Sequence, residues 1–347
     1  MAYLILSNGM TFEGQRIGAQ GVASGEMVFT TGVVGYLETL TDPAYAGQVV
    51  VQTFPQIGNY GVISEDLEGA AAVAGYVVHE LCDAPSNFRC EGTLDEYLKK
   101  NGVVGISGVD TRELTRILRS SGPLTAVICD EAPADIPEAA SVRAGCTETT
   151  VYPAQGEKKY AVTLVDYGVK KSVIAHLCSL GCEVKAVPQE TPAAAILAEK
   201  PDGVILSPGP GDPAQMAQAI ALSQLLIGKA PLLGLGLGHQ LIALAMGAKT
   251  VRLPVGHRGS NHPVKALGGS RTYITSQNHG YAVCADSLPA SAVMTYQNVN
   301  DHSCEGVEYP ALRCMTVQFE PDTKKSFIGT SFVYDRFIAM MGGNADA

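Results

Sequence analysis

The sequence predicts an α/β protein in which a mixed β/α domain precedes a doubly wound parallel-sheet domain. From Tyr160 onward, strand-like and helix-like segments alternate, which is typical of parallel sheets covered by helices on both faces. Within this half, Pro231–Gln240 passes from a short apolar run through Gly236 into helix formers at helical spacing. The first half instead alternates strand-like pieces with Gly-rich turns.

Composition indicates a folded protein of about two domains, since the chain has 347 residues with 46% hydrophobic and 17% charged side chains. A net charge of −10 argues against nucleic-acid and anionic-membrane partners, which require clustered Lys and Arg. The nine cysteines include no C-x-x-C pair, so we expect reduced, mostly buried thiols and a cytoplasmic location. The first residues have no basic segment of the kind that begins a signal peptide. The apolar stretch 230–248 is better explained by a strand, turn and helix than by a membrane span.

The N-terminal domain is predicted to cover residues 1–146. One helix is expected at Leu94–Lys100 and another at Thr111–Ser120, with Asp110 as the N-cap and Glu113 completing a capping box. Residues 147–159 are rich in polar residues without apolar periodicity and are predicted to be a linker. The second domain then covers residues 160–347. The strands expected in the first domain are Tyr3–Leu6, Glu26–Thr30 and Gln48–Thr53.

The second domain is predicted to begin as alternating strands and helices and to become richer in strands after the elbow. The expected strands are Tyr160–Asp166, Cys182–Val187, Gly203–Ser207, Pro231–Leu235, Thr272–Ser276, Val293–Gln297, Gly306–Tyr309 and Cys314–Phe319. The expected helices are Lys170–Leu180, Thr191–Glu199, Pro213–Gly228, a helix from His239 to Met246, and a final helix over Lys325–Met341.

Three loops follow strands of this predicted sheet: Ser207–Pro213, the turn at Gly236, and Glu320-Pro321-Asp322. Because the carboxyl ends of parallel strands converge on one crevice, these loops are expected to share a site. The turn at Gly236 has the frame of a nucleophile elbow, where hydrolases place a Ser or Cys on a sharp strand-to-helix turn. Glycine tolerates that backbone conformation but has no side chain that could attack a substrate.

Several motifs in this order resemble the small subunits of carbamoyl phosphate synthetases, within the class I glutamine amidotransferase family. The resemblance extends over nearly the whole chain. In the first half it rests on GYLETLTDPAYAGQ (35–48), FPQIGNYG (54–61), SNFR (86–89) and DTRELTRILR (110–119). In the second half it rests on DYGVKKSVI (166–174), SPGPGDP (207–213), GLGLGHQLIALAMGAKT (234–250), GHRGSNHPV (256–264) and SQNHGYAV (276–283).

The resemblance implies that the catalytic site is not intact. In the family, a Cys at the elbow attacks the glutamine carboxamide, a His acts as base and a Glu orients that His. These positions are Gly236, Glu320 and Asp322 in this sequence. The glutamine-binding positions mostly remain, although Ala44 replaces the usual Ser. By resemblance they are Ala44, Gly209, Gly211, Leu237, Gln240, Asn278, Gly280 and Tyr281.

Substitute groups for the missing nucleophile and base are not evident. Ser207, Cys304 and Cys314 are conceivable replacement nucleophiles, and a structural role is expected for His239 at the helix start. Glu320 and Asp322 are expected to be solvated loop carboxylates. The alternative is that the two acids attract ammonium for a partner that uses free ammonia.

No metal site is predicted. His257, His262 and His279 match no compact ligand spacing, and no Cys or acidic residue near them in the sequence completes a set. The stretch Gly234–Gly238 is also not a dinucleotide-binding motif, since no acidic residue ends a strand about twenty residues further on.

The resemblance implies a large, ATP-using synthetase subunit as partner, docked mainly by the N-terminal domain. ATP and Mg would then belong to that subunit, with no cofactor in this chain. The leading hypothesis is a pseudo-glutaminase that supports or regulates an ammonia-dependent synthetase in arginine or pyrimidine biosynthesis. Two alternatives stay open: an active glutaminase with rewired groups, and a stand-alone interaction module that senses glutamine.

Overall fold

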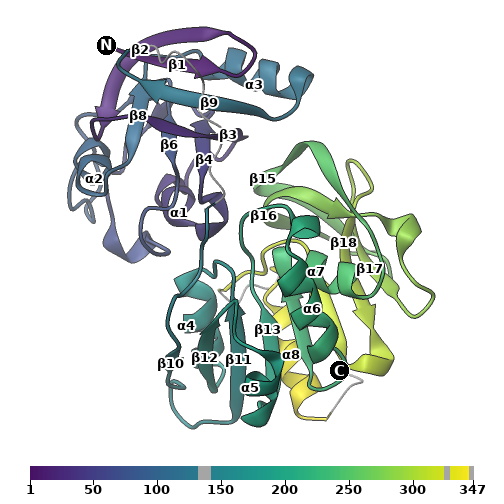
Figure 1. The fold of residues 1–347 in the computed structure, drawn as a ribbon. Helices are drawn as coiled ribbons and strands as arrows, with labels where there is room; N and C mark the ends of the chain where they lie inside the picture. Colours follow the sequence, from purple (N-terminus) through teal and green to yellow (C-terminus); the bar gives the residue numbers. More distant parts are fainter. Residues whose placement is uncertain (132–141, 324–328, 344–347) are drawn as a thin grey trace. The chain divides into compact units, whose positions relative to one another are not determined.

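The computed structural model describes residues 1–131, 142–323 and 329–343 (Figure 1). The chain divides into two compact units, Met1–Val142 and Arg143–Ala347. This division agrees with the predicted two-domain organisation, although the boundary lies a few residues before the predicted one.

The N-terminal unit is a closed barrel with the strand order β1-β2-β8-β6-β4-β3-β9. The neighbours β3–β4, β4–β6 and β6–β8 are parallel, and the other pairs are antiparallel. The sequence predicted only three of these strands, because barrel closure depends on pairing between distant segments. The barrel strands are β1 (Ala2–Leu6), β2 (Thr11–Gly18), β3 (Ala23–Thr30), β4 (Gln48–Gln52), β6 (Gly75–Val77), β8 (Val104–Ser107) and β9 (Leu124–Cys129).

Three α-helices accompany the barrel in the described part of this unit: α1 (Tyr36–Thr41), α2 (Leu94–Lys100) and α3 (Thr111–Ser121). The side chain of Asp110 accepts a hydrogen bond from the Glu113 amide at 2.9 Å, which confirms the predicted N-cap of α3. A reciprocal capping box is present instead at α2, between Thr93 and Glu96. Two short strands, β5 (Gln56–Ile57) and β7 (Glu80–Leu81), form a separate parallel pair.

The C-terminal unit contains a ten-stranded sheet with the order β10-β12-β11-β13-β14-β19-β18-β16-β15-β17. The central strands β12, β11, β13, β14 and β19 are parallel, as the sequence predicted. The strands are β10 (Thr150–Tyr152), β11 (Tyr160–Asp166), β12 (Cys182–Pro188), β13 (Gly203–Leu206), β14 (Leu232–Leu235), β15 (Thr250–Ala266), β16 (Thr272–Val283), β17 (Val293–Asn298), β18 (Cys304–Tyr309) and β19 (Cys314–Val317).

Helices cover both faces of the parallel part, so the doubly wound architecture is confirmed (Figure 1). Adjacent strand residues belong to different cores: Leu232 packs with one cluster and Leu233 with the other. Because successive strand side chains point to opposite faces, the two clusters lie on the two sides of the sheet. The first core contains residues of α5 (Ala193–Ala198), α6 (Ala217–Leu226) and α7 (Leu237–Ala245), and the second contains residues of α4 (Lys171–Ser179) and α8 (Phe332–Met341).

Three expectations about this unit need correction. The predicted linker, residues 147–159, contains β10, which pairs antiparallel with β12 and so belongs to the sheet. The predicted strand Thr272–Ser276 extends to Val283 and pairs with β15, which the sequence did not indicate. Within β15, Pro, Gly and His residues interrupt any regular alternation of apolar side chains.

The final helix begins at Phe332, and residues 325–328 of its predicted range lie outside the described residues.

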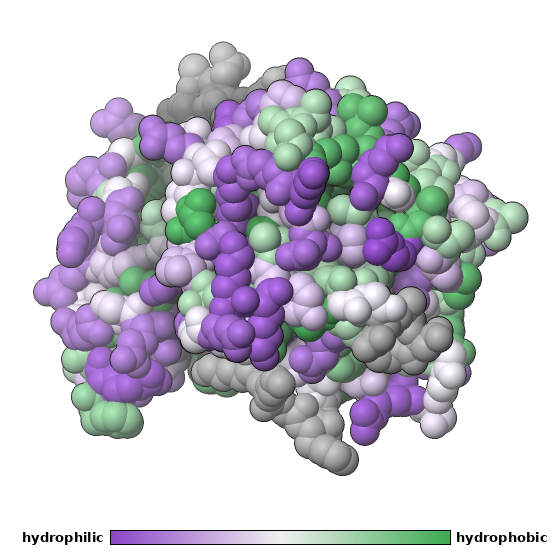
Figure 2. Space-filling model, turned by 90° about the horizontal axis from the view of Figure 1, so that it is seen from below, coloured by the Kyte–Doolittle hydropathy of each residue, from purple (hydrophilic) through white to green (hydrophobic). Residues whose placement is uncertain are grey.

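The structure bears on the predicted free thiols and on the apolar stretch 230–248. All nine cysteines lie in the described residues as free thiols. Among the described helices, none combines the length and apolar character needed to cross a bilayer. On the face drawn in Figure 2, hydrophilic and hydrophobic residues are interspersed. Scattered exposed apolar residues of this kind are ordinary on protein surfaces.

Candidate functional site

The three loops singled out from the sequence follow neighbouring strands of the parallel sheet. β13, β14 and β19 lie side by side, and the loops leave their carboxyl ends. The amide of Gly236 donates to the Val317 carbonyl at 2.9 Å, and the amide of Gly238 donates to the Ser207 carbonyl at 3.2 Å. The three loops therefore lie at one edge of the sheet, as predicted; that they form one functional site stays a prediction.

Gly236 keeps the backbone of a nucleophile elbow. Its φ of 53° and ψ of −108° lie where an L-residue is strained, and helix α7 begins at the next residue, Leu237. A Cβ placed on Gly236 would lie 3.3 Å from the Pro208 Cβ, a tight but adjustable contact. The turn has thus kept both the conformation and most of the room that a nucleophile requires, without the nucleophile.

An ion pair occupies the position of the family's base. The Lys170 ammonium lies 2.5 Å from Oε2 of Glu320, and each side chain is only 20% exposed. Lys170 follows β11 and directly precedes α4, so the pair joins two loops at the carboxyl edge of the sheet. Lys170 lies within the family-like stretch 166–174, and no role was predicted for it. Its place just after a strand was the available signal.

Asp322, at the position of the orienting Glu, is bound to its own loop. Its Oδ2 accepts hydrogen bonds from the Thr330 amide at 2.7 Å and from the Thr330 hydroxyl at 3.0 Å. The expectation of two solvated loop carboxylates is therefore wrong. Because Lys170 compensates the charge of Glu320, the arrangement also does not favour the alternative in which both acids attract ammonium.

The conceivable replacement groups are held in structural roles. Ser207 is fully buried; its hydroxyl donates to the Pro208 carbonyl and accepts from the Tyr167 amide, both at 2.8 Å. Burial raises the pKa of the Cys304 thiol to about 12 and raises that of Cys314 further, so neither forms a thiolate near neutral pH. Burial lowers the pKa of His239 to about 3, and its Nδ1 lies 2.8 Å from Thr316 Oγ1, which confirms the structural expectation.

The positions on the parallel edge that were predicted to bind glutamine have structural roles of their own. A Cβ on Gly209 would lie 2.5 Å from the Tyr167 carbonyl oxygen, so only glycine fits there. Gly211 has a φ of 106°, which also favours glycine. The Gln240 amide is buried and donates to the Tyr281 carbonyl at 2.7 Å and to Gln318 Oε1 at 2.8 Å. Gln240 therefore braces α7 against its neighbours.

The remaining glutamine-binding positions are divided between the two units. Asn278, Gly280 and Tyr281 lie on β16, where Asn278 pairs with Arg258 of β15. Ala44 lies in the N-terminal unit, buried within the 3-10 helix Pro43–Tyr45. That these positions bind glutamine stays a prediction.

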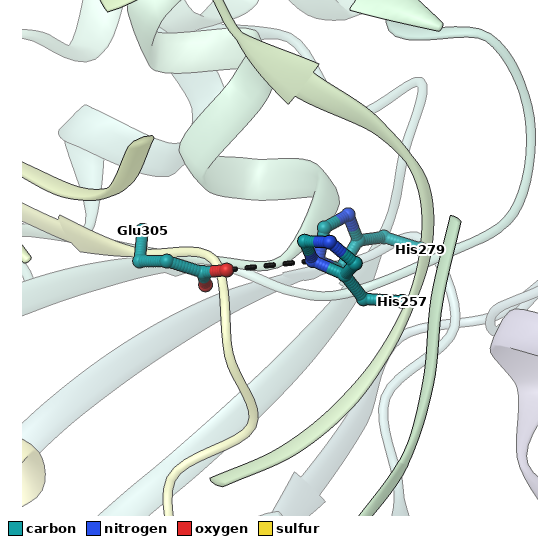
Figure 3. Close-up of side chains that lie close together, drawn as sticks. All are labelled: His257, His279 and Glu305. Carbon is teal, nitrogen blue, oxygen red and sulfur yellow. Dashed lines mark ion pairs between the residues drawn. The ribbon is translucent and has the colours of Figure 1, made fainter. Parts of the chain in front are cut away.

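The structure also brings together histidines that the sequence left scattered. His257 and His279 are paired across β15 and β16, and Glu305 of β18 lies against them, as Figure 3 shows. His257 also contacts Asp301 at 2.8 Å. The expectation that no acidic residue accompanies these histidines is therefore wrong. Neither acid could be assigned from the sequence, because both are remote from the histidines along the chain.

The comparisons with known proteins agree with this architecture. Residues 163–340 match the family model described as class I glutamine amidotransferase, which is the class that the elbow and the doubly wound sheet define. Residues 4–128 match the model described as the CPSase domain of the carbamoyl-phosphate synthase small chain. The chain belongs to the carbamoyl phosphate synthase small-chain family.

Relatives match over almost their full lengths. The chain is 40% identical to the carbamoyl phosphate synthase small chain of Syntrophotalea carbinolica, covering 99% of this chain and 98% of the relative. It is 43% identical to the carbamoyl phosphate synthase pyrimidine-specific small chain of Bacillus subtilis, covering 97% and 95%. Among solved structures, a glutamine amidotransferase from Thermotoga maritima matches with 17% identity and a TM-score of 0.39, covering 46% of this chain and 75% of that one.

Proposed function

We propose that this chain is a carbamoyl phosphate synthase small subunit that has lost glutaminase activity and supports an ammonia-dependent large subunit. The observation that carries this proposal is Gly236 at the elbow. A glycine has no atom that could form the thioester through which a family member processes glutamine. The Lys170–Glu320 ion pair at the base position supports the same conclusion, since an ion-paired carboxylate is a poor proton acceptor.

The expected loss of glutaminase activity is large. In a serine protease, removing the nucleophile or the base costs on the order of 10⁶ in kcat. This corresponds to roughly 8 kcal/mol of transition-state stabilisation. Backbone amides at the elbow could still polarise a carbonyl, but such groups alone leave only a small fraction of the activity.

The partner and setting follow from family membership as parts of the same proposal. A large subunit would bind ATP and Mg²⁺ and form carbamoyl phosphate, while this chain would bind neither. The complex would serve arginine or pyrimidine biosynthesis in the cytoplasm. The pseudo-glutaminase would act on the large subunit through association, by stabilising it or by changing its affinity for ammonium.

The decisive experiment measures carbamoyl phosphate synthesis by this chain copurified with its cognate large subunit. Glutamine and ammonium chloride are compared as nitrogen sources, and the large subunit alone is the control for the effect of association. We expect activity with ammonium, none above background with glutamine, and a lower KM for ammonium or greater stability in the complex. Comparable activity with glutamine would overturn the proposal.

Two further outcomes address the alternatives. If glutamate is released and Ser207→Ala or Glu320→Gln abolishes that release, the chain is an active glutaminase with rewired groups. If no large subunit copurifies, but glutamine raises the melting temperature of the chain, a glutamine-sensing module is favoured. Either outcome would contradict the proposed function.

A further inference from the structure

Two buried imidazoles and a buried carboxylate converge in the antiparallel part of the second sheet (Figure 3). His257 and His279 come from β15 and β16, and Glu305 comes from β18, which pairs with β16. One potential ligand atom from each residue lies within 4.8 Å of the others. These three side chains have no role in the proposed function.

The outer nitrogen of each imidazole faces an oxygen that can only accept. His257 Nε2 lies 2.8 Å from the Asp301 carboxylate, and His279 Nδ1 lies 2.8 Å from the Tyr281 carbonyl. In the neutral form of each ring, the outer nitrogen therefore carries the proton. Two lone pairs are left pointing inward, on His257 Nδ1 and His279 Nε2.

The inward lone pairs meet further acceptors. Gln277 Oε1 lies 3.0 Å from His257 Nδ1 and 2.8 Å from His279 Nε2, while the Gln277 amide nitrogen donates to Thr275. Glu305 Oε1 lies 3.5 Å from His257 Nδ1. These four acceptor atoms lie close together, and only Glu305 Oε1 among them has another donor within the described residues, the Asn298 amide at 3.1 Å. A cation among them would interact favourably with all four.

The Glu305 carboxylate strengthens this argument. Its side chain is 0% exposed, and Oε2 finds no hydrogen-bond partner among the described residues. A buried carboxylate is costly unless it is paired or coordinates a metal. Protonation of His257 could compensate Glu305, but it would leave Nε2 of His279 facing Gln277.

We propose that His257, His279 and Glu305 bind a divalent transition-metal ion of the zinc type. Two imidazoles and one carboxylate suit zinc and its neighbours in the first row, whereas magnesium and calcium prefer all-oxygen sites. Zinc–nitrogen bonds of about 2.0–2.1 Å place tetrahedral ligand atoms roughly 3.3 Å apart. The 3.5 Å between His257 and Glu305 is close to this spacing. Gln277 Oε1 or a water would supply the fourth ligand.

The surrounding contacts match the second shell of a metal site. A metal-bound histidine usually donates its other N–H to a carboxylate or a backbone carbonyl, which fixes the tautomer. Asp301 and the Tyr281 carbonyl do this for His257 and His279, respectively. The ion would join the β15–β16 hairpin to β18 and stabilise that part of the sheet.

The test titrates the full chain, stripped with a chelator, with zinc chloride by calorimetry and with cobalt chloride by absorption. We expect one ion per chain, a higher melting temperature with zinc, and a cobalt spectrum of nitrogen and oxygen ligands. Glu305→Gln and His279→Gln should each weaken binding at least about 100-fold. Asp301→Asn should weaken it by about 10- to 100-fold, as expected for a second-shell partner. His302→Asn, at an exposed histidine outside the cluster, is the matched control and should bind as the wild type does.

Several outcomes would overturn the proposal. A strong thiolate-to-cobalt band would place the ion on cysteines, and unchanged affinity in Glu305→Gln would place it elsewhere. Absence of binding to the folded wild-type chain would exclude the site. Circular dichroism shows whether Glu305→Gln and His279→Gln fold. If either does not, the zinc affinity of Asp301→Asn, a change at a partly exposed residue, tests the proposal instead. Unchanged affinity in Asp301→Asn then counts against the proposal.

Discussion

Gly236 has the backbone geometry of a nucleophile elbow but no side chain that could act as the nucleophile. The strand, turn and helix of a nucleophile elbow are complete, and the backbone keeps the unusual conformation of that turn. A glycine accepts this conformation without strain, so the sheet keeps this edge geometry without a side chain at the elbow. The surrounding fold therefore does not reveal by itself whether the elbow carries a nucleophile.

Restoring a thiol tests this interpretation. Gly236→Cys should fold, with a loss of about 1–3 kcal/mol in the free energy of unfolding, because an L-residue is strained there and its Cβ approaches Pro208. Gly236→Ala is the control for strain without a thiol. Glutamate release should stay at background, since Glu320 is ion-paired with Lys170 and no imidazole stands at the base position. Multiple turnovers of glutamine by the single variant would show that a base is already present.

The buried His239 should make stability depend on pH. Its pKa is about 3 in the folded chain, against about 6.5 when unfolded, so the unfolded chain binds one more proton between these values. The free energy of unfolding therefore falls as the pH decreases below about 6.5. In His239→Asn, which keeps a donor for Thr316 Oγ1, this decline should be shallower. Urea unfolding between about pH 7.5 and pH 5 measures it, with His302→Asn as control; equal slopes in wild type and His239→Asn would contradict the prediction.

At the level of elements, short sequence signals place helix ends well. The N-cap at Asp110 was predicted, and helix α3 begins at the next residue. The stronger signal at α2 was overlooked, although Thr93 and Glu96 have the spacing of a capping box. Both signals act within four residues, so no tertiary contact is needed to interpret them.

Removing the α3 cap should destabilise the N-terminal unit. Asp110→Ala removes the acceptor for the Glu113 amide and should lower the free energy of unfolding by about 0.5–2 kcal/mol. Asp110→Asn keeps an acceptor at the same position and is the matched control. Denaturant unfolding measures both variants. Equal losses in the two would assign the effect to charge rather than to the cap.

At the scale of the whole molecule, the two units have separate hydrophobic cores. The core residues of the barrel unit and those of the sheet unit belong to different clusters. Each unit also completes its own sheet without strands from the other. These are the properties of independently folding domains.

We therefore expect chains 1–142 and 143–347 to fold when produced separately. Each fragment should show a near-ultraviolet circular dichroism signal and a single cooperative urea transition. Leu233→Ala in the second fragment is a useful reference, because truncating a fully buried leucine should cost about 2–5 kcal/mol. A fragment that lacks fixed tertiary structure would show that its core requires the other unit.

The sequence alone determined the parallel sheet, the elbow at Gly236 and the convergence of three loops, because these depend on local periodicity and on the geometry of βα units. It also carried the prediction that the family's nucleophile and base are replaced at Gly236 and Glu320, since residue identity needs no coordinates. The tertiary structure decided the closure of the barrel and the place of β10 in the second sheet. It also decided the Lys170–Glu320 ion pair and the meeting of His257, His279 and Glu305. Those contacts join residues far apart in the chain, and strand order and register bring them together, neither of which is encoded in any short stretch of sequence.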